Sequence, residues 1–151
     1  MPTTAETAYG LRATLDSARA KMATWTDAHA TEKWRGVEKW SRKEILGHLL
    51  DSASNNHQRF VRAAISGDYT GPGYEQDAWN KTGAYQTFRW SSLLSLWTSY
   101  NTLLAHVLEN IPSERSKAIC IVADNEPVTL EFLAEDYVAH MKHHLEQMFG
   151  Y

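Results

Sequence analysis

The chain has little of what disulfide-rich, nucleic-acid-binding or membrane-spanning proteins need. It contains one cysteine, Cys120, which excludes disulfides within the chain and any paired-cysteine metal or redox motif. The formal charge is −3, and no cluster of lysine and arginine would attract nucleic acid or an anionic membrane. No apolar run approaches the ~18 residues of a membrane span, and the N-terminus lacks a signal-peptide pattern. We therefore expect a soluble, cytoplasmic protein without nucleic-acid or membrane partners.

The composition that remains is that of an ordinary globular domain. Of the 151 residues, 43% are hydrophobic and 22% are charged, which suffices for one core without cross-links. We expect a single domain over residues 1–151. Cys120 lies in the apolar segment 118–122, so its thiol should be buried.

Four long segments show helical periodicity, with apolar residues recurring every three or four positions. Thr3 and Glu6 can form a capping box before the first segment, and Ser41 and Glu44 can form one before the second. Pro112 stops the third. The predicted helices run from about 3 to 25, from 41 to 67, from 91 to 110 and from 129 to 150.

Strand-like alternation is confined to the short pieces 119–122 and 128–130, so the pattern favours an all-α four-helix bundle. The connection between helices 2 and 3, residues 67–90, is long and rich in glycine and aromatic residues. A helix of ~20 residues is about 30 Å long, and an extended chain of twenty-odd residues can cross that distance. The second and third helices can therefore run parallel, joined by a long crossover.

Three of the seven histidines are candidates for one metal site. His140 and His144 are four residues apart in the fourth helix, which places them on one face with Cβ atoms about 5–6 Å apart. Two imidazoles at that spacing can bind one first-row metal ion through bonds of about 2.0–2.1 Å. A third imidazole, from His48 in the second helix, would leave coordination positions open, as in catalytic metal sites.

Helical geometry makes the other histidines less suitable as ligands. His143 and His106 point roughly 140–150° away from the apolar stripes of their helices, so both should be exposed. His57 lies roughly 180° around the helix from His48, and His29 falls in a polar region. One observation opposes the site: His48 itself lies at the boundary of its apolar stripe or outside it, unless that helix buries a second face against a partner subunit. Histidines that are suitably spaced by chance remain the alternative.

Residues near these histidines suggest further roles. Ligating histidines usually donate their second N–H to a polar partner, and Asp51 and Gln147 are candidates. Gln147 is favoured because it lies near the His140/His144 face, whereas Asp51 is expected to be a solvated helix residue. Aromatic residues of the crossover can line a substrate pocket or pack in the core: Trp79, Tyr85 and Trp90.

A short polar strip accompanies His48 along its helix. Ser52 and Asn55 share its face and can border a cavity. No cluster of arginines indicates an anionic cofactor, although three arginines could bind one: Arg59, Arg62 and Arg89.

The chain resembles the DinB-like superfamily, which also contains the YfiT-type proteins. The matching residues are Ile-Leu-Gly-His-Leu-Leu-Asp-Ser at 45–52, after a tryptophan and a capping serine, and His140-x-x-His143-His144-x-x-Gln147. The pairs Tyr100-Asn101 and Ile111-Pro112 also match. The resemblance spans nearly the whole chain, and the two histidine motifs are its most specific part.

The resemblance implies an up-down-down-up four-helix bundle and one divalent metal ion, zinc or nickel, held by His48, His140 and His144. It also implies a homodimer, which we expect to involve the second helix through residues such as Phe60 and Ile65. Members include S-transferases that use a low-molecular-weight thiol, and YfiT-type metal-dependent hydrolases. We expect a thiol-dependent S-transferase acting on a small-molecule substrate first; the alternatives are a hydrolase and a non-catalytic metal-binding or sensing bundle.

Overall fold

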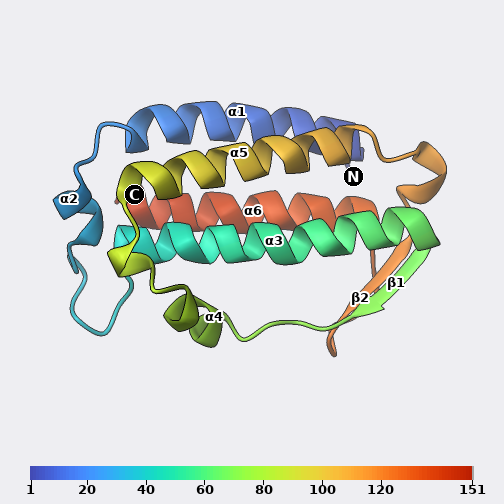
Figure 1. Ribbon diagram of the computed structural model, residues 1–151. Helices are drawn as coiled ribbons and strands as arrows, with labels where there is room; N and C mark the ends of the chain where they lie inside the picture. Colours follow the sequence, from blue (N-terminus) through green and yellow to red (C-terminus); the bar gives the residue numbers. More distant parts are fainter. Residues whose placement is uncertain (151) are drawn as a thin grey trace.

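Four long helices lie side by side in the computed structural model, which describes residues 1–150 (Figure 1). They are α1 (Thr4–Met22), α3 (Arg42–Ser66), α5 (Trp90–Glu109) and α6 (Leu130–Phe149). Both α1 and α3 pack against α5 and α6. In Figure 1, α1 and α6 run from right to left, whereas α3 and α5 run from left to right. The predicted four-helix bundle with up-down-down-up topology is therefore confirmed.

The helix α3 begins and ends at the signals that its sequence contains. The Ser41 hydroxyl accepts from the backbone N–H of Glu44 at 3.2 Å, and the Glu44 carboxylate accepts from the backbone N–H of Ser41 at 2.9 Å. Gly67 ends the helix with φ at 88°, a left-handed conformation that costs glycine little. The helix is therefore continuous over 25 residues, and residues separated by whole turns share one face.

The segment between α3 and α5 is the predicted crossover, and it contains structure that was not predicted. It includes the strand β1 (Asp68–Gly71), the helix α4 (Gln76–Gly83) and a turn of 3₁₀ helix (Tyr85–Thr87). Figure 1 shows the crossover running back beneath α3, and both α4 and the 3₁₀ turn contact that helix. As a result α3 is covered on two sides, by the bundle and by the crossover.

A small sheet lies beside one end of the bundle and contacts α3 and α6 (Figure 1). The strand β1 pairs in parallel with β2 (Ile119–Val122), and β2 pairs antiparallel with β3 (Val128–Thr129). The strands β2 and β3 coincide with the two pieces of strand-like alternation in the sequence, whereas β1 and the short helix α2 (Asp27–Thr31) were not predicted. Cys120, in β2, is buried as predicted.

The core lies between the four long helices and includes Trp97, Met141 and Phe60, all essentially inaccessible to solvent. The expectation that Phe60 contributes to a dimer interface is therefore wrong. Its ring packs edge-on against Tyr137 on α6, with centroids 5.8 Å apart. By contrast Ile65, one and a half turns further along α3, is 72% exposed.

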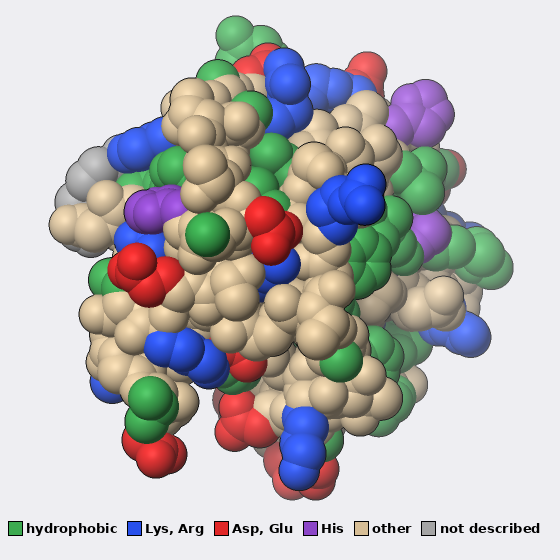
Figure 2. Space-filling view, turned by 60° about the vertical axis from the view of Figure 1, so that its left-hand side comes forward, with side chains coloured by type: hydrophobic (Ala, Val, Ile, Leu, Met, Phe, Trp, Pro, Cys, Tyr) green, Lys and Arg blue, Asp and Glu red, His purple; other side chains and the backbone are tan. Residues whose placement is uncertain are grey.

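The surface carries charges of both signs. Figure 2 shows acidic and basic side chains interspersed over one face of the molecule, so this face has no extended field of one sign. Among residues 1–150, no helix combines the length and the hydrophobicity that a bilayer span requires.

Candidate metal centre

The three predicted histidines meet between α3 and α6. The Nε2 atom of His140 lies 3.3 Å from Nε2 of His48 and 3.1 Å from Nε2 of His144. One ring nitrogen from each histidine lies within 4.8 Å of the others. His48 stands in the second turn of α3, and the other two stand in the C-terminal half of α6, which runs antiparallel to α3. The antiparallel arrangement brings residues 92 positions apart in the sequence to one point.

His48 is completely buried, so the helical wheel was wrong to place it at the edge of the apolar stripe or outside it. The wheel considers a single buried face, whereas the chain itself covers His48. The indole of Trp40, just before α3, lies with its centroid 5.0 Å from the His48 ring, and the two α6 imidazoles cover another side. No partner subunit is needed to explain this burial.

The environment keeps all three imidazoles neutral, which is the form that binds metal. Burial, together with the smaller effects of the nearby His144 and His140, lowers the pKa of His48 to about 3. Burial is also the main reason that the pKa of His140 and that of His144 lie below the ordinary value.

Gln147 fixes the orientation of one ring. Its side-chain oxygen lies 2.9 Å from Nδ1 of His144 and accepts the proton of that nitrogen. The Nε2 lone pair of His144 is then directed towards His140. Gln147 was the favoured orienting residue in the sequence. No such partner holds His48, because its Nδ1 atom has no hydrogen-bond partner within the described part of the chain.

The nitrogen cluster suits a metal ion better than a set of hydrogen bonds. Nε2 of His144 carries a lone pair, so it can only accept. Nε2 of His140 would then have to donate its one proton to both His144 and His48 at once. Two nitrogens that share one first-row ion lie no more than about 4 Å apart, since each bond is about 2.0–2.1 Å. Both measured Nε2 separations meet that condition. The donor set therefore fits a divalent ion such as zinc.

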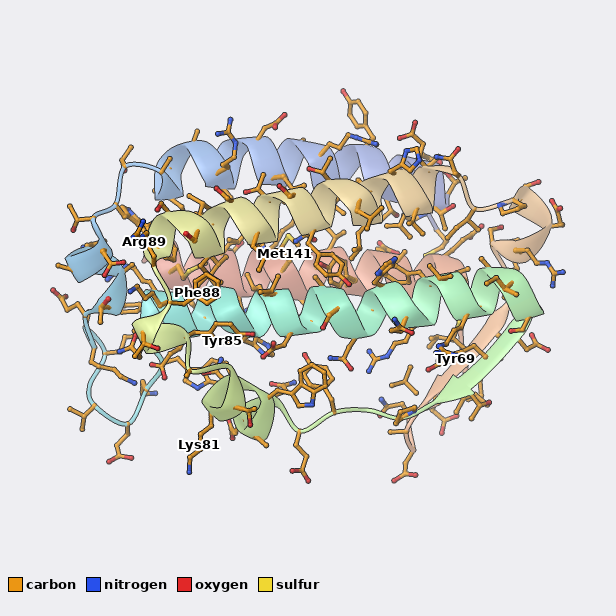
Figure 3. The ribbon with its side chains drawn as sticks, in the orientation of Figure 1. Tyr69, Lys81, Tyr85, Phe88, Arg89 and Met141 are labelled. Atoms are coloured by element: carbon orange, nitrogen blue, oxygen red, sulfur yellow. The ribbon has the colours of Figure 1, made fainter. Side chains whose placement is uncertain are left out.

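Asp51 occupies an environment that the sequence did not reveal. It was expected to be solvated, but it is only 6% exposed. The hydroxyl of Tyr85, in the crossover, donates to Oδ1, while Oδ2 has no partner among the residues described. The Tyr85 ring reaches this place because Gly47 has no side chain: a Cβ there would lie 2.0 Å from the ring. Figure 3 shows Tyr85 against the underside of α3.

The remaining histidines lie away from the cluster or point out of it. His143 and His106 are exposed, as predicted. The Nδ1 atom of His57 lies 3.0 Å from the hydroxyl of Tyr100 on α5, on the opposite side of α3 from His48. His29 lies in α2.

Two cavities flank the α3 side of the site. One, of about 310 Å³, reaches His140 and is bordered by Ser52, which was expected to border a cavity. The other, of about 480 Å³, is bordered by Asp51, Trp79 and Tyr85. The third aromatic candidate, Trp90, is buried, and its ring N–H donates to the backbone carbonyl of Met22.

The three arginines of the sequence differ in their surroundings. Arg59 is buried and borders the cavity that reaches His140, whereas Arg62 and Arg89 are exposed. Asn56, also on this cavity, was not singled out in the sequence, although its position two turns and a little beyond His48 places it near the same face.

Comparisons with known proteins agree with the fold of the chain. The family model of the DinB superfamily matches residues 12–148. None of the curated proteins matches the chain. Among solved structures, the fold is similar to YfiT from Bacillus subtilis, described as a probable metal-dependent hydrolase with an unusual four-helix bundle topology. The TM-score is 0.74 at 22% sequence identity, covering 97% of this chain and 82% of the other.

Proposed function

The chain belongs to the DinB superfamily, and on that premise we propose that it is a metal-dependent enzyme acting on a small molecule. In this proposal His48, His140 and His144 hold one divalent ion, with zinc or nickel as the first candidates. The observation that carries the proposal is the convergence of the three Nε2 atoms, 3.1 and 3.3 Å apart, from two different helices.

The chain's own residues prepare the site for such an ion. Burial keeps the imidazoles unprotonated, Gln147 orients His144, and Trp40 covers one side of His48. Held by three neutral ligands, a divalent ion keeps its full charge and can lower the pKa of water to near 7 or deprotonate a thiol. The cavity of about 310 Å³ beside His140 can admit a small substrate.

The only cysteine is unsuitable as a nucleophile, which favours one that is activated by the metal. Burial raises the pKa of the Cys120 thiol to about 11, so it is protonated at neutral pH. It stands in the strand β2, outside the histidine cluster.

Water is the first candidate nucleophile, which would make the protein a hydrolase. The fold likeness to the B. subtilis protein, described as a probable metal-dependent hydrolase, supports this choice. A low-molecular-weight thiol is the second candidate, which would make it an S-transferase. That choice is supported by the resemblance of the histidine motifs to the superfamily, whose members include thiol-dependent S-transferases.

Parallel assays of cobalt-loaded protein distinguish the two reactions. Hydrolysis of simple esters or amides with a pH midpoint near 7 supports the hydrolase. A thiol-induced change in the cobalt absorption spectrum, together with faster conjugation of that thiol to a small electrophile, supports the transferase. Either activity should disappear in His48→Ala and persist in His143→Ala, the exposed control. Metal binding without either activity would contradict an enzymatic role and favour a non-catalytic metal-binding or sensing bundle.

A further inference from the structure

A row of buried polar residues runs along α3 from the histidine cluster towards the sheet. Arg59 follows His48 by 11 residues, which is three helical turns plus about 20° and a rise of about 16 Å. The two side chains therefore stand on nearly the same face. Ser52 and Asn56 lie between them, and all four residues are at most 9% exposed.

Arg59 is a buried cation that lacks an acidic partner among residues 1–150. Its guanidinium donates to the side-chain oxygen of Asn56 and to the backbone carbonyl of Pro72, in the crossover, both at 3.4 Å. Both acceptors are neutral, and both distances are at the long end of the hydrogen-bond range. Burial lowers the pKa of Arg59 below its ordinary value. A buried charge without a counter-charge is costly, so the surroundings of Arg59 favour the binding of an anion.

Asn56 holds the guanidinium in a defined orientation. Its amide nitrogen donates to the backbone carbonyl of Ser52 at 2.8 Å and to the Ser52 hydroxyl at 3.3 Å. The Asn56 oxygen is therefore left to face Arg59. A guanidinium carries five N–H donors, so several remain for a ligand after these two contacts.

The same cavity borders both Arg59 and His140. It lies between α3, α6 and the crossover, which contributes Tyr74, and its volume is about 310 Å³. Side chains on a helix lean towards its N-terminus, so Arg59 leans back towards the histidines. Asp136 also borders the cavity, but it is exposed, stands one turn before His140 on α6 and forms no ion pair with Arg59.

We propose that Arg59 binds a carboxylate of the substrate, whose reacting end lies at the histidine cluster. The substrate class is thus a small organic acid in which a few bonds separate the carboxylate from the reacting group. This inference rests on the proposed function, because it takes the histidines as the reacting centre. The guanidinium fork matches the two oxygens of a carboxylate, which makes Arg59 a determinant of specificity. The alternative is that Arg59 only ties the crossover to α3 through Pro72.

Calorimetric titration of the zinc-loaded protein with four thiols tests the inference. The probes are 3-mercaptopropionate, 6-mercaptohexanoate and the uncharged amide of each. A thiolate binds an open zinc position whichever nucleophile the reaction uses, so each acid and its amide share this contact and differ in the presence of the carboxylate. For at least one chain length, we expect the acid to bind about tenfold to a hundredfold more tightly than the amide.

Variants separate the arginine from the metal in this titration. Arg59→Met keeps the apolar stem and should remove the preference for the acid while leaving zinc content unchanged. Arg59→Lys keeps the charge but not the fork and should retain part of the preference. Arg62→Met is the matched control, because Arg62 is exposed on the same helix and bonds to Gln58.

The possible failures are distinguishable. If the protein takes up neither zinc nor nickel, the proposed function is wrong and the inference falls with it. If zinc binds but none of the four probes binds, or acid and amide bind equally, the role of Arg59 is wrong and the proposed function stands. A preference that survives in Arg59→Met would show that the metal itself binds the carboxylate, which also overturns the inference.

Discussion

Asp51 is a carboxylate held out of water one turn after His48. The Tyr85 hydroxyl satisfies one of its oxygens, and the other is buried without a hydrogen-bond partner among residues 1–150. Burial raises the pKa of Asp51 above its ordinary value of 3.8, although the hydrogen bond from Tyr85 opposes that rise. The charged form is therefore destabilised in the folded protein.

We expect Asp51→Asn to raise the melting temperature at pH 7. Because the folded-state pKa lies above 3.8, protonated Asp51 favours folding, and this contribution is lost as the pH rises through the folded-state pKa. The amide oxygen of the variant can still accept from Tyr85. Melting curves of both proteins should diverge at neutral pH and converge below pH 3.8. A variant that is less stable at pH 7 would contradict this account of the buried carboxylate.

At this scale, the part of the site that depends on one helix could be predicted from the sequence. The spacing of His140 and His144, and the position of Gln147 three residues further on, follow from helical geometry alone. The burial of His48 and Asp51 could not, because Trp40 and Tyr85 cover them from outside the helix. Arg59 was only one of three candidates, since nothing local shows which face the crossover encloses.

At the scale of elements, Tyr85 joins the crossover to the helix that carries His48. We expect Gly47→Ala to destabilise the fold by about 1–3 kcal/mol, because the new Cβ would overlap the Tyr85 ring. Gly10→Ala in α1 is the matched control: apart from its own stretch of helix, no atom of residues 1–150 lies within 4 Å of its Cβ position, so it should stabilise the fold by about 0.5–1 kcal/mol. Urea unfolding measures both. Equal effects of the two substitutions would show that Tyr85 does not need the space at Gly47.

The start of α5 depends on an aspartate from another element. No side chain of its own N-cap residue, Arg89, caps this helix, but Asp27 in α2 accepts from the backbone N–H of Trp90 at 2.9 Å. This bond and the ammonium of Lys43 lower the pKa of Asp27 below 3.8. The carboxylate therefore contributes stability above pH 3.8 that is lost as the pH falls through the folded-state pKa.

Asp27→Ala should lower the melting temperature at pH 7, because α5 loses its cap and the buried Lys43 loses its counter-ion. The difference from the unsubstituted protein should shrink in acid, where Asp27 is protonated. Asp16→Ala, an exposed carboxylate on α1, is the control and should have little effect. If the melting temperature of Asp27→Ala were lower by the same amount at every pH, the cause would be lost packing and not the lost charge.

The long helices were predictable as elements, whereas the short ones were not. Their apolar periodicity spans many turns, and the capping box at Ser41 marks the start of α3. The strand β1 exists only because β2, some fifty residues later, pairs with it. No pattern within residues 68–71 indicates that pairing. The helix α4 was likewise not predictable from its own residues, because its contacts with α3 stabilise it.

At the scale of the whole molecule, the oligomeric state stays a prediction. The apolar residues around much of the circumference of α3 suggested a partner subunit, but the crossover covers many of them. Phe60 lies in the core. Ile65 remains as an apolar side chain that is 72% exposed on that helix. We expect light scattering at tens of micromolar to give twice the chain mass of 17.2 kDa, and Ile65→Lys to give the single-chain mass. The single-chain mass for the unsubstituted protein would contradict the dimer.

The bundle as a whole brings α3 and α6 together at one point, and a metal ion there is the central claim. The most direct test is the metal content per chain after loading with zinc and removal of excess ion, measured by elemental analysis. We predict one ion per chain for the unsubstituted protein and for His143→Ala, and none for His144→Ala. Of these two histidines, His144 faces His48 and His140, whereas His143 is exposed. Equal metal content in the two variants, or no metal in the unsubstituted protein, would contradict the account.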